Sequence, residues 1–110
     1  MNIDDLTIKQ ARELAALFIS PQSQDSPWEI GKIYLIRTVT MIDTGRLVAV
    51  SPQELVLEDA AWIADTGRFS NAVASAEFGE TEPFPNGRVI IGRGSIIDAV
   101  QISKTIRSQK

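Results

Sequence analysis

The chain has 110 residues, a net charge of −3, and neither cysteine nor histidine. This length suits a single domain with one modest core. The missing residue types exclude disulfides, thiolate chemistry, cysteine or histidine zinc sites and general-base catalysis by histidine, so no metal and no other cofactor is expected. No apolar run approaches the roughly 20 residues that span a bilayer, and the amino terminus is acidic rather than basic. We therefore predict a cytoplasmic protein with no signal peptide and no membrane partner.

An amphipathic helix is predicted over residues 1–20. The sequence TIKQ at 7–10 has the form of a capping box, in which a threonine and a glutamine side chain satisfy the first free amides. Apolar residues then recur on one helical face at Ile8, Ala11, Ala15 and Phe18. Pro21 ends the helix, and the polar, proline-bounded sequence that follows predicts a surface linker over residues 21–30.

From residue 31 the hydrophobic pattern becomes that of strands. Five segments rich in β-branched and apolar residues are predicted to be strands: 32–42, 46–50, 54–63, 88–92 and 95–102. Pro52 marks a turn between the second and third, because proline cannot donate a ladder hydrogen bond in a central strand. Antiparallel strands this short usually close into a small barrel, so the fold is predicted to be mainly β.

A long insertion, at about 63–87, separates the third and fourth predicted strands. Residues 67–78 are rich in alanine with helical spacing, which predicts a short helix, and residues 80–87 are predicted to be irregular. The organisation is thus one domain over 1–110, with the helix, the linker, a barrel over 31–102 and a basic tail over 103–110.

The tetrapeptide Asp-Thr-Gly-Arg occurs twice, at 43–46 and 65–68. Asp-Thr-Gly is typical of aspartic proteases, where two aspartates share one proton, and VIIGRG at 89–94 resembles a segment that supports this site in retroviral-type proteases. In that family the residue after the glycine is small because it packs inside the loop, whereas here it is Arg46 and Arg68. No glycine-rich flap separates the first motif from VIIGRG. The chain is therefore predicted to be no enzyme, with no catalytic residue, and the protease is kept only as an alternative.

Both copies of the motif are interpreted as turns. Gly45 is predicted to supply a positive φ in a hairpin between the first two strands, and Asp65 or Thr66 to cap the element that follows. Neither Asp43 nor Asp65 is expected to act in catalysis.

Three segments carry a resemblance to a known family. TGRLVAV at 44–50 and ELVLEDAAW at 54–62 resemble the first conserved block of Sm and Sm-like (LSm) proteins, in which the third strand ends in a Leu-x-Leu-x-Asp-Ala pattern. VIIGRGSIIDAV at 89–100 resembles the second block, in which an apolar strand meets Arg-Gly and then alternating apolar residues. The whole pattern is most similar to the small Sm-like proteins attributed to marine phages, which would place the protein in a host cytoplasm.

This resemblance implies an N-terminal α-helix followed by a five-stranded bent antiparallel Sm-like (SH3-type) barrel. It also implies a homo-oligomeric ring of roughly five to seven subunits, in which the fourth strand of one subunit pairs with the fifth strand of the next. Residues 88–92 and 95–102 are short apolar strands, and pairing them around a closed ring would leave no exposed edge.

The resemblance further implies a site for single-stranded RNA or DNA. The loop before the third strand contributes Gln53 and Glu54, and the Arg-Gly turn contributes Arg93 and Gly94. No aromatic residue stands at Gln53 or Glu54 to stack a base, and Glu54 repels phosphate. Arg93 supplies the electrostatic half of the site, since an arginine can hydrogen-bond a phosphate and stack on a base. Whether Arg93 contacts the ligand or braces a neighbouring loop, against Glu54 or Asp98, stays open.

Other polar and aromatic residues allow more than one interpretation. Arg37 either points into the ring pore, as part of the nucleic-acid site, or pairs with Glu58. Trp28 and Trp62 are interpreted as core residues in preference to base-stacking platforms. Glu58 and Asp59 with Asp65 lack the ligand spacing of a cation site.

The charge distribution leaves two functions open. The acidic excess lies before Pro83, and the later part of the chain carries Arg88, Arg93, Lys104, Arg107 and Lys110 against Asp98 alone. A basic rim repeated around a ring can bind a phosphate backbone. A structural ring or assembly component that binds no nucleic acid is the alternative.

Overall fold

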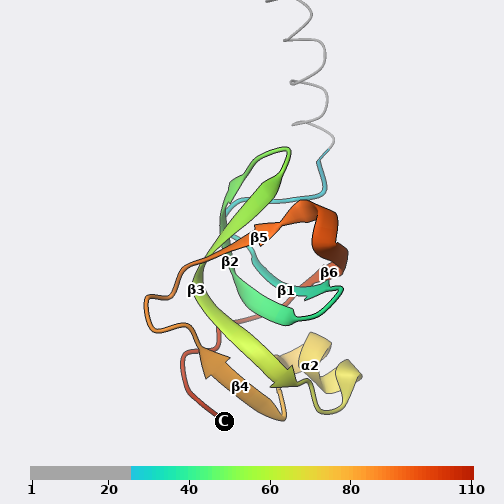
Figure 1. The fold of residues 1–110 in the computed structure, drawn as a ribbon. Coiled ribbons are helices and arrows are strands. Elements are labelled where there is room, and N and C mark those ends of the chain that lie inside the picture. The colour runs from blue at the N-terminus through green and yellow to red at the C-terminus, as the bar shows by residue number, and fades with distance from the viewer. Residues whose placement is uncertain (1–25) are drawn as a thin grey trace, which may run out of the picture.

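The computed structural model describes residues 26–110, so the helix predicted over 1–20 and the first part of the predicted linker lie outside the described residues. Residues 26–110 form a mainly β structure, with one antiparallel sheet of six strands (Figure 1). The elements are β1 (Ile33–Thr38), β2 (Ile42–Val50), β3 (Glu54–Asp65), α2 (Phe69–Ser75), β4 (Glu80–Pro83), β5 (Val89–Gly92), the 3-10 helix η1 (Arg93–Ser95) and β6 (Ile96–Gln101). The predicted mainly β, antiparallel class is confirmed. Neither helix of this part of the chain has the length and apolar character needed to cross a membrane.

The strand β3 organises the sheet. Along one edge it pairs with β2, and along the other it pairs first with β5, at Glu54–Leu57, and then with β4, from Ala61 to Asp65. The sheet order is β4-β3-β2-β1-β6, with β5 beside the first part of β3. Asp59 lies between the two stretches and has a φ of 50°. A left-handed residue inside a strand is typical of a bulge, which bends the strand, so β3 bends where it changes partner.

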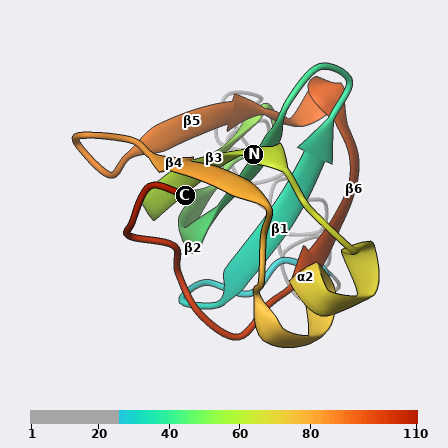
Figure 2. The ribbon, with the colours of Figure 1, turned by 90° about the horizontal axis from the view of Figure 1, so that it is seen from below.

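Apolar side chains are buried on both faces of β1. One face carries the first core cluster, formed by Tyr34, Ile36, Leu47, Leu55, Leu57, Ala60 and Ile91. The other carries the second core cluster, formed by Leu35, Ile63, Ala72, Ala76, Phe78 and Ile102. The helix α2 lies beside β1 and β6 in Figure 2 and supplies Ala72 to the second cluster. The insertion therefore covers a face of the sheet that would otherwise expose Leu35 to water.

Most of the predicted elements are present, and one was missed. The helix predicted within 67–78 is confirmed by α2, and the turn at Pro52 separates β2 from β3. The prediction that 80–87 is irregular is wrong at Glu80–Pro83, which forms β4. Its outer edge is held by the end of the chain, because the Thr81 amide donates to the Lys110 carbonyl at 3.0 Å and the Lys110 amide donates back at 2.9 Å.

The first Asp-Thr-Gly is not a turn, so that interpretation was wrong. Asp43, Thr44 and Gly45 lie inside β2, and the chain reverses before them, where the Thr38 hydroxyl accepts from the Met41 amide at 2.9 Å. Gly45 has no positive φ. It is required because β3 crosses so close that a Cβ atom there would lie 3.0 Å from the Glu58 carbonyl oxygen and 3.0 Å from the Leu57 Cβ.

The second Asp-Thr-Gly is a turn, as predicted. Gly67 has a φ of 66°, and its amide donates to the Asp65 carboxylate at 2.8 Å. The predicted capping role is wrong, however, because Arg68 occupies the N-cap of α2 and no side chain accepts a hydrogen bond there. Asp65 closes its own turn instead.

Gly45→Ala should lower the free energy of unfolding by about 1 to 3 kcal/mol, because the added methyl group must displace the β3 backbone. Gly94→Ala is the matched control, since a Cβ atom there meets nothing within 4 Å and the glycine has no positive φ. That variant should change the free energy of unfolding by less than about 1 kcal/mol. Denaturant unfolding of both variants checks the comparison, and equal effects would contradict the close crossing of β3.

Candidate functional site

The structure brings together four of the five predicted site residues. The Arg93 amide donates to the Gln53 carbonyl at 2.9 Å, and Glu54 is the strand partner of Gly92. Gly94 follows Arg93 in η1 and is exposed. The loop between β2 and β3 and the η1 turn thus lie together, at the end of the sheet away from α2 and β4 (Figure 1).

Arg93 braces the loop between β2 and β3. Its Nη1 donates to the Ser51 carbonyl at 2.7 Å, and the side chain is half-buried. Arg93 therefore binds a backbone oxygen. It binds neither Glu54 nor Asp98, the carboxylates that the sequence suggested as partners. Within residues 26–110 Arg93 forms no ion pair, and only Nη1 of its guanidinium donates a hydrogen bond. The remaining donors are therefore available to a ligand.

Arg37 does not join this group. It is the strand partner of Asp98, and its Nε donates to Oδ1 of that carboxylate at 2.7 Å while Nη2 donates to Oδ2. The guanidinium also lies 5.2 Å from the ring centre of Phe69, the first residue of α2. This hydrogen-bonded pair lowers the pKa of Asp98 and raises the pKa of Arg37. Of the two alternatives that the sequence left open for Arg37, the pairing with Glu58 is not formed, and a nucleic-acid contact would have to compete with Asp98.

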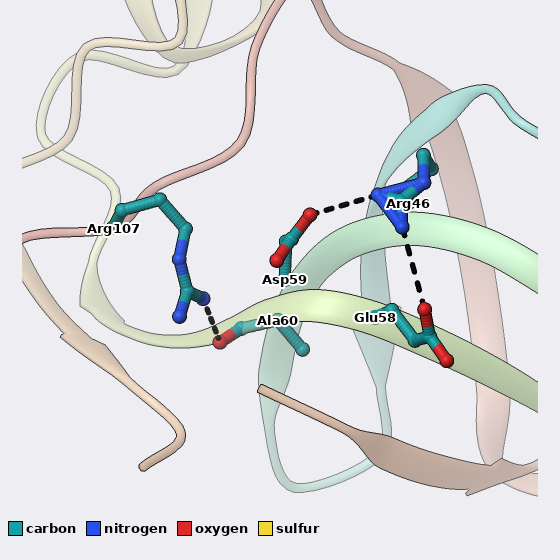
Figure 3. A network of polar contacts seen from close by, with 5 residues as sticks. All are labelled: Arg46, Glu58, Asp59, Ala60 and Arg107. Atoms are coloured by element: carbon teal, nitrogen blue, oxygen red, sulfur yellow. Dashed lines mark hydrogen bonds and ion pairs between the residues drawn. The ribbon is translucent and has the colours of Figure 1, made fainter. Parts of the chain in front are cut away.

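The side chains of Glu58 and Asp59 are both bound by Arg46. Its Nη1 donates to Asp59 at 2.8 Å and its Nη2 to Glu58 at 3.3 Å (Figure 3). Arg107 of the tail reaches the same bend of β3, where its Nη1 donates to the Ala60 carbonyl at 3.4 Å (Figure 3). These contacts support the bulge of β3. The Glu58 and Asp59 carboxylates therefore act as ion-pair partners of Arg46.

A second site, which the sequence did not indicate, lies on the face of the sheet that carries the first core cluster. Asp43 is the strand partner of both Ile36 and Trp62, and Trp62 is the partner of Glu82, so these side chains form a row across four strands. The residues after β4 wall off the row and leave a hollow of about 470 Å³. We call it the Asp43 hollow, and its lining residues are Met41, Asp43, Trp62, Glu82, Pro83, Phe84, Pro85 and Val89.

The carboxylate of Asp43 is the unusual group in this hollow. Asp43 is only 8% exposed, and its side chain accepts no hydrogen bond and forms no ion pair within residues 26–110. Burial raises the pKa of this carboxyl group above its ordinary value. No side-chain oxygen or nitrogen of residues 26–110 is both fully buried and without a partner, so the Asp43 carboxylate opens onto the hollow, where it is a candidate ligand-binding group.

The two tryptophans differ in environment. Trp28 packs against the first core cluster and contacts Tyr34 edge-on, with ring centres 5.1 Å apart, so the prediction of a core residue is confirmed. The same prediction is wrong for Trp62, which is 37% exposed and lines the Asp43 hollow. One feature of the sequence could have indicated the position of Asp43. If the strand begins at Ile42, the alternation of faces along residues 42–50 puts Asp43 on the same, core-facing side as Leu47.

Comparisons with known proteins give no relative for this chain. No family model matches it, no curated protein matches it, and no solved structure matches it.

Asp43→Asn should stabilise the protein at neutral pH. Because the pKa of Asp43 is raised, the folded state favours the protonated carboxyl group. The contribution of this group to the free energy of unfolding is therefore largest below its ordinary pKa of 3.8 and is lost as pH rises through the raised value. Asparagine carries no charge to desolvate, so the difference in unfolding free energy between the variant and the parent protein should grow from acidic to neutral pH.

The control for this experiment is Asp98→Asn, which should change the free energy of unfolding in the opposite direction: it should destabilise the protein at neutral pH. The pKa of Asp98 is lowered by Arg37, so its contribution to stability is present at neutral pH and is lost as pH falls through the lowered value. Denaturant unfolding at about pH 3 and about pH 7 measures both variants. A pH-independent effect of Asp43→Asn would contradict the raised pKa of this partly desolvated carboxyl group.

Proposed function

We propose that the protein is a non-enzymatic Sm-like subunit that assembles into a closed ring and binds single-stranded RNA or DNA. In this assignment β1, β2, β3, β5 and β6 are the five strands of the bent barrel, and β4 with α2 belongs to the insertion. The Arg-Gly turn between the last two strands is η1, and the loop before the third strand holds Ser51–Gln53. The proposal is supported by the contact between these two loops, which Arg93 makes through its backbone and its side chain.

The observation that carries the assembly is a pair of unpaired strand edges. Within residues 26–110, β5 pairs only with β3 and β6 pairs only with β1, so each strand keeps one free edge. Ile90 of β5 is 58% exposed and Ile97 of β6 is 64% exposed. Free edges with apolar side chains promote pairing with another chain, and a head-to-tail pairing that closes removes them all.

Binding of nucleic acid is assigned to the loops that Arg93 joins. Each subunit would present the free guanidinium donors of Arg93 beside the exposed side chain of Gln53. A ring repeats this arginine around its axis, so several phosphates can be neutralised together although the chain is acidic. Such binding should be strongly dependent on salt concentration. An arginine plane also stacks on bases, which compensates for the absence of an aromatic residue in this loop.

A structural ring that binds no nucleic acid is the second candidate. It is favoured by the engagement of the cations in internal contacts: Arg37 is paired with Asp98, Arg46 with Glu58 and Asp59, and Arg93 with the Ser51 carbonyl. Both candidates require the same ring, so they differ only in the behaviour of Arg93 toward a ligand.

Ile90→Lys should dissociate the ring, because it places a desolvated charge in the proposed pairing of β5 with β6 of the next subunit. The matched control is Val39→Lys, since Val39 is 70% exposed and lies outside the strands, between β1 and β2. Light scattering should give roughly five to seven subunit masses for the parent protein and for Val39→Lys, and one for Ile90→Lys. A parent protein that stays monomeric at every concentration would rule out the ring.

Arg93→Ala should weaken binding of a single-stranded oligonucleotide by about tenfold or more while leaving the ring intact. Arg68→Ala removes one exposed arginine at the opposite end of the sheet and controls for the change in net charge. The measurements are an oligonucleotide titration at several salt concentrations and the mass of the same samples. If the parent protein forms the ring but binds no oligonucleotide, the structural candidate is correct. If Arg93→Ala dissociates the ring, the arginine acts as a brace.

A further inference from the structure

The Asp43 hollow has the features of a binding site for a small ligand. Its volume of about 470 Å³ falls within the range of roughly 300 to 1,000 Å³ that is usual for such sites. Most of its lining is apolar or aromatic, with Trp62 and Phe84 as the aromatic residues. Asp43, more than nine-tenths buried and without a partner within residues 26–110, supplies the one buried polar group. Apolar walls around a single unpaired polar group give a ligand both affinity and orientation.

The charge of the hollow selects the class of ligand. Asp43 and Glu82 are its two ionisable lining residues, and no lysine or arginine of the described part of the chain lines it. Two carboxylates repel phosphate, so this site is distinct from the proposed nucleic-acid site at Arg93. A cation is attracted by the carboxylates and also by the faces of the aromatic rings.

The geometry of the Asp43 carboxylate indicates which kind of cation would fit. One carboxylate presents two oxygens side by side, which match the parallel N–H donors of a planar guanidinium or amidinium group. Such a group also stacks on flat aromatic walls and is more weakly hydrated than an alkylammonium, so it loses less on entering an apolar hollow.

We propose that the Asp43 hollow binds a planar organic cation, with a guanidinium or amidinium group that donates two hydrogen bonds to Asp43 and stacks against Trp62. The inference does not depend on the ring or on nucleic-acid binding, and it gives Asp43 a binding role that the sequence interpretation did not. The insertion between β3 and β5 would then contribute to binding, because Glu82 and Pro83 of β4 and the two residues that follow, Phe84 and Pro85, supply half of the lining.

The affinity should depend on pH through Asp43. The carboxyl group must be ionised to hold the cation, and burial raises its pKa, so binding should strengthen as pH rises through that value and should release a proton below it. Glu82 of β4 is the other titratable group that faces the hollow, while the neighbours of Asp43 on β1 and β3 are the uncharged Ile36 and Trp62. Arg37 of β1 is held by Asp98 and does not line the hollow.

The test is calorimetric titration of the full chain with phenylguanidinium, compared with phenylurea, which has a similar shape and no charge. Phenylguanidinium should bind at neutral pH at least about tenfold more tightly than phenylurea, in line with the strength of a charge-assisted hydrogen-bonded pair. Asp43→Asn should remove this preference, and because asparagine relieves the buried charge, the variant should stay folded. Asp98→Asn removes an exposed carboxylate outside the hollow and should leave the affinity unchanged.

Two further measurements complete the test. Trp62→Leu should weaken phenylguanidinium binding, and the fluorescence of Trp62 should change on titration of a Trp28→Phe background. A blocked Gly-Arg-Gly peptide distinguishes the source of the group: tighter binding than phenylguanidinium indicates an arginine of a protein partner, and weaker binding indicates a free small molecule. Equal affinities for phenylguanidinium and phenylurea, or full affinity in Asp43→Asn, would overturn the proposal.

Discussion

The bend of β3 at Asp59 is the feature on which the rest of the structure depends. A straight strand of this length would offer one continuous edge, whereas the bent strand gives its first part to β5 and its last part to β4. The bend is held by two residues of β2: Arg46 binds the carboxylates of Glu58 and Asp59, and Gly45 leaves room for the β3 backbone beside it. Partly exposed ion pairs of this kind contribute little to stability, so we assign them the role of fixing the position of the bend.

One consequence is that β3 connects two sites of opposite character. At its first residues the strand meets the loop that Arg93 braces, and near its last residues Trp62 forms a wall of the Asp43 hollow. The first site offers the guanidinium donors of the half-buried Arg93, and the second offers the carboxyl group of Asp43 in a hollow that Trp62 and Phe84 also line. The ligands proposed for the two sites therefore carry opposite charges, and a ligand suited to one site would be repelled by the other.

The sequence predicted the elements better than it predicted their contacts. Runs of β-branched residues located five strands, and the alanine-rich spacing located α2, because these signals are local. The role of Gly45 was missed because the reason for that glycine is the neighbouring strand, which no local pattern shows. The partner of Arg37, Asp98, lies 61 residues away and was not among the alternatives drawn from the sequence, because the pairing of β1 with β6 shows in no local pattern. The Asp43 hollow could not be predicted, because its walls come from β4, whose alternating glutamates and proline resemble a loop.

The exchange of hydrogen bonds between Thr81 and Lys110 has a consequence for the dynamics of the hollow. The strand β4 is only four residues long, and its two edges are held by different partners, β3 on one side and the last residue of the chain on the other. Local opening of residues 108–110 would free the Thr81 amide and carbonyl on that edge of β4, while Glu82 stays paired with Trp62 of β3. A ligand that β4 holds in the proposed Asp43 hollow would therefore also stabilise residues 108–110 against opening.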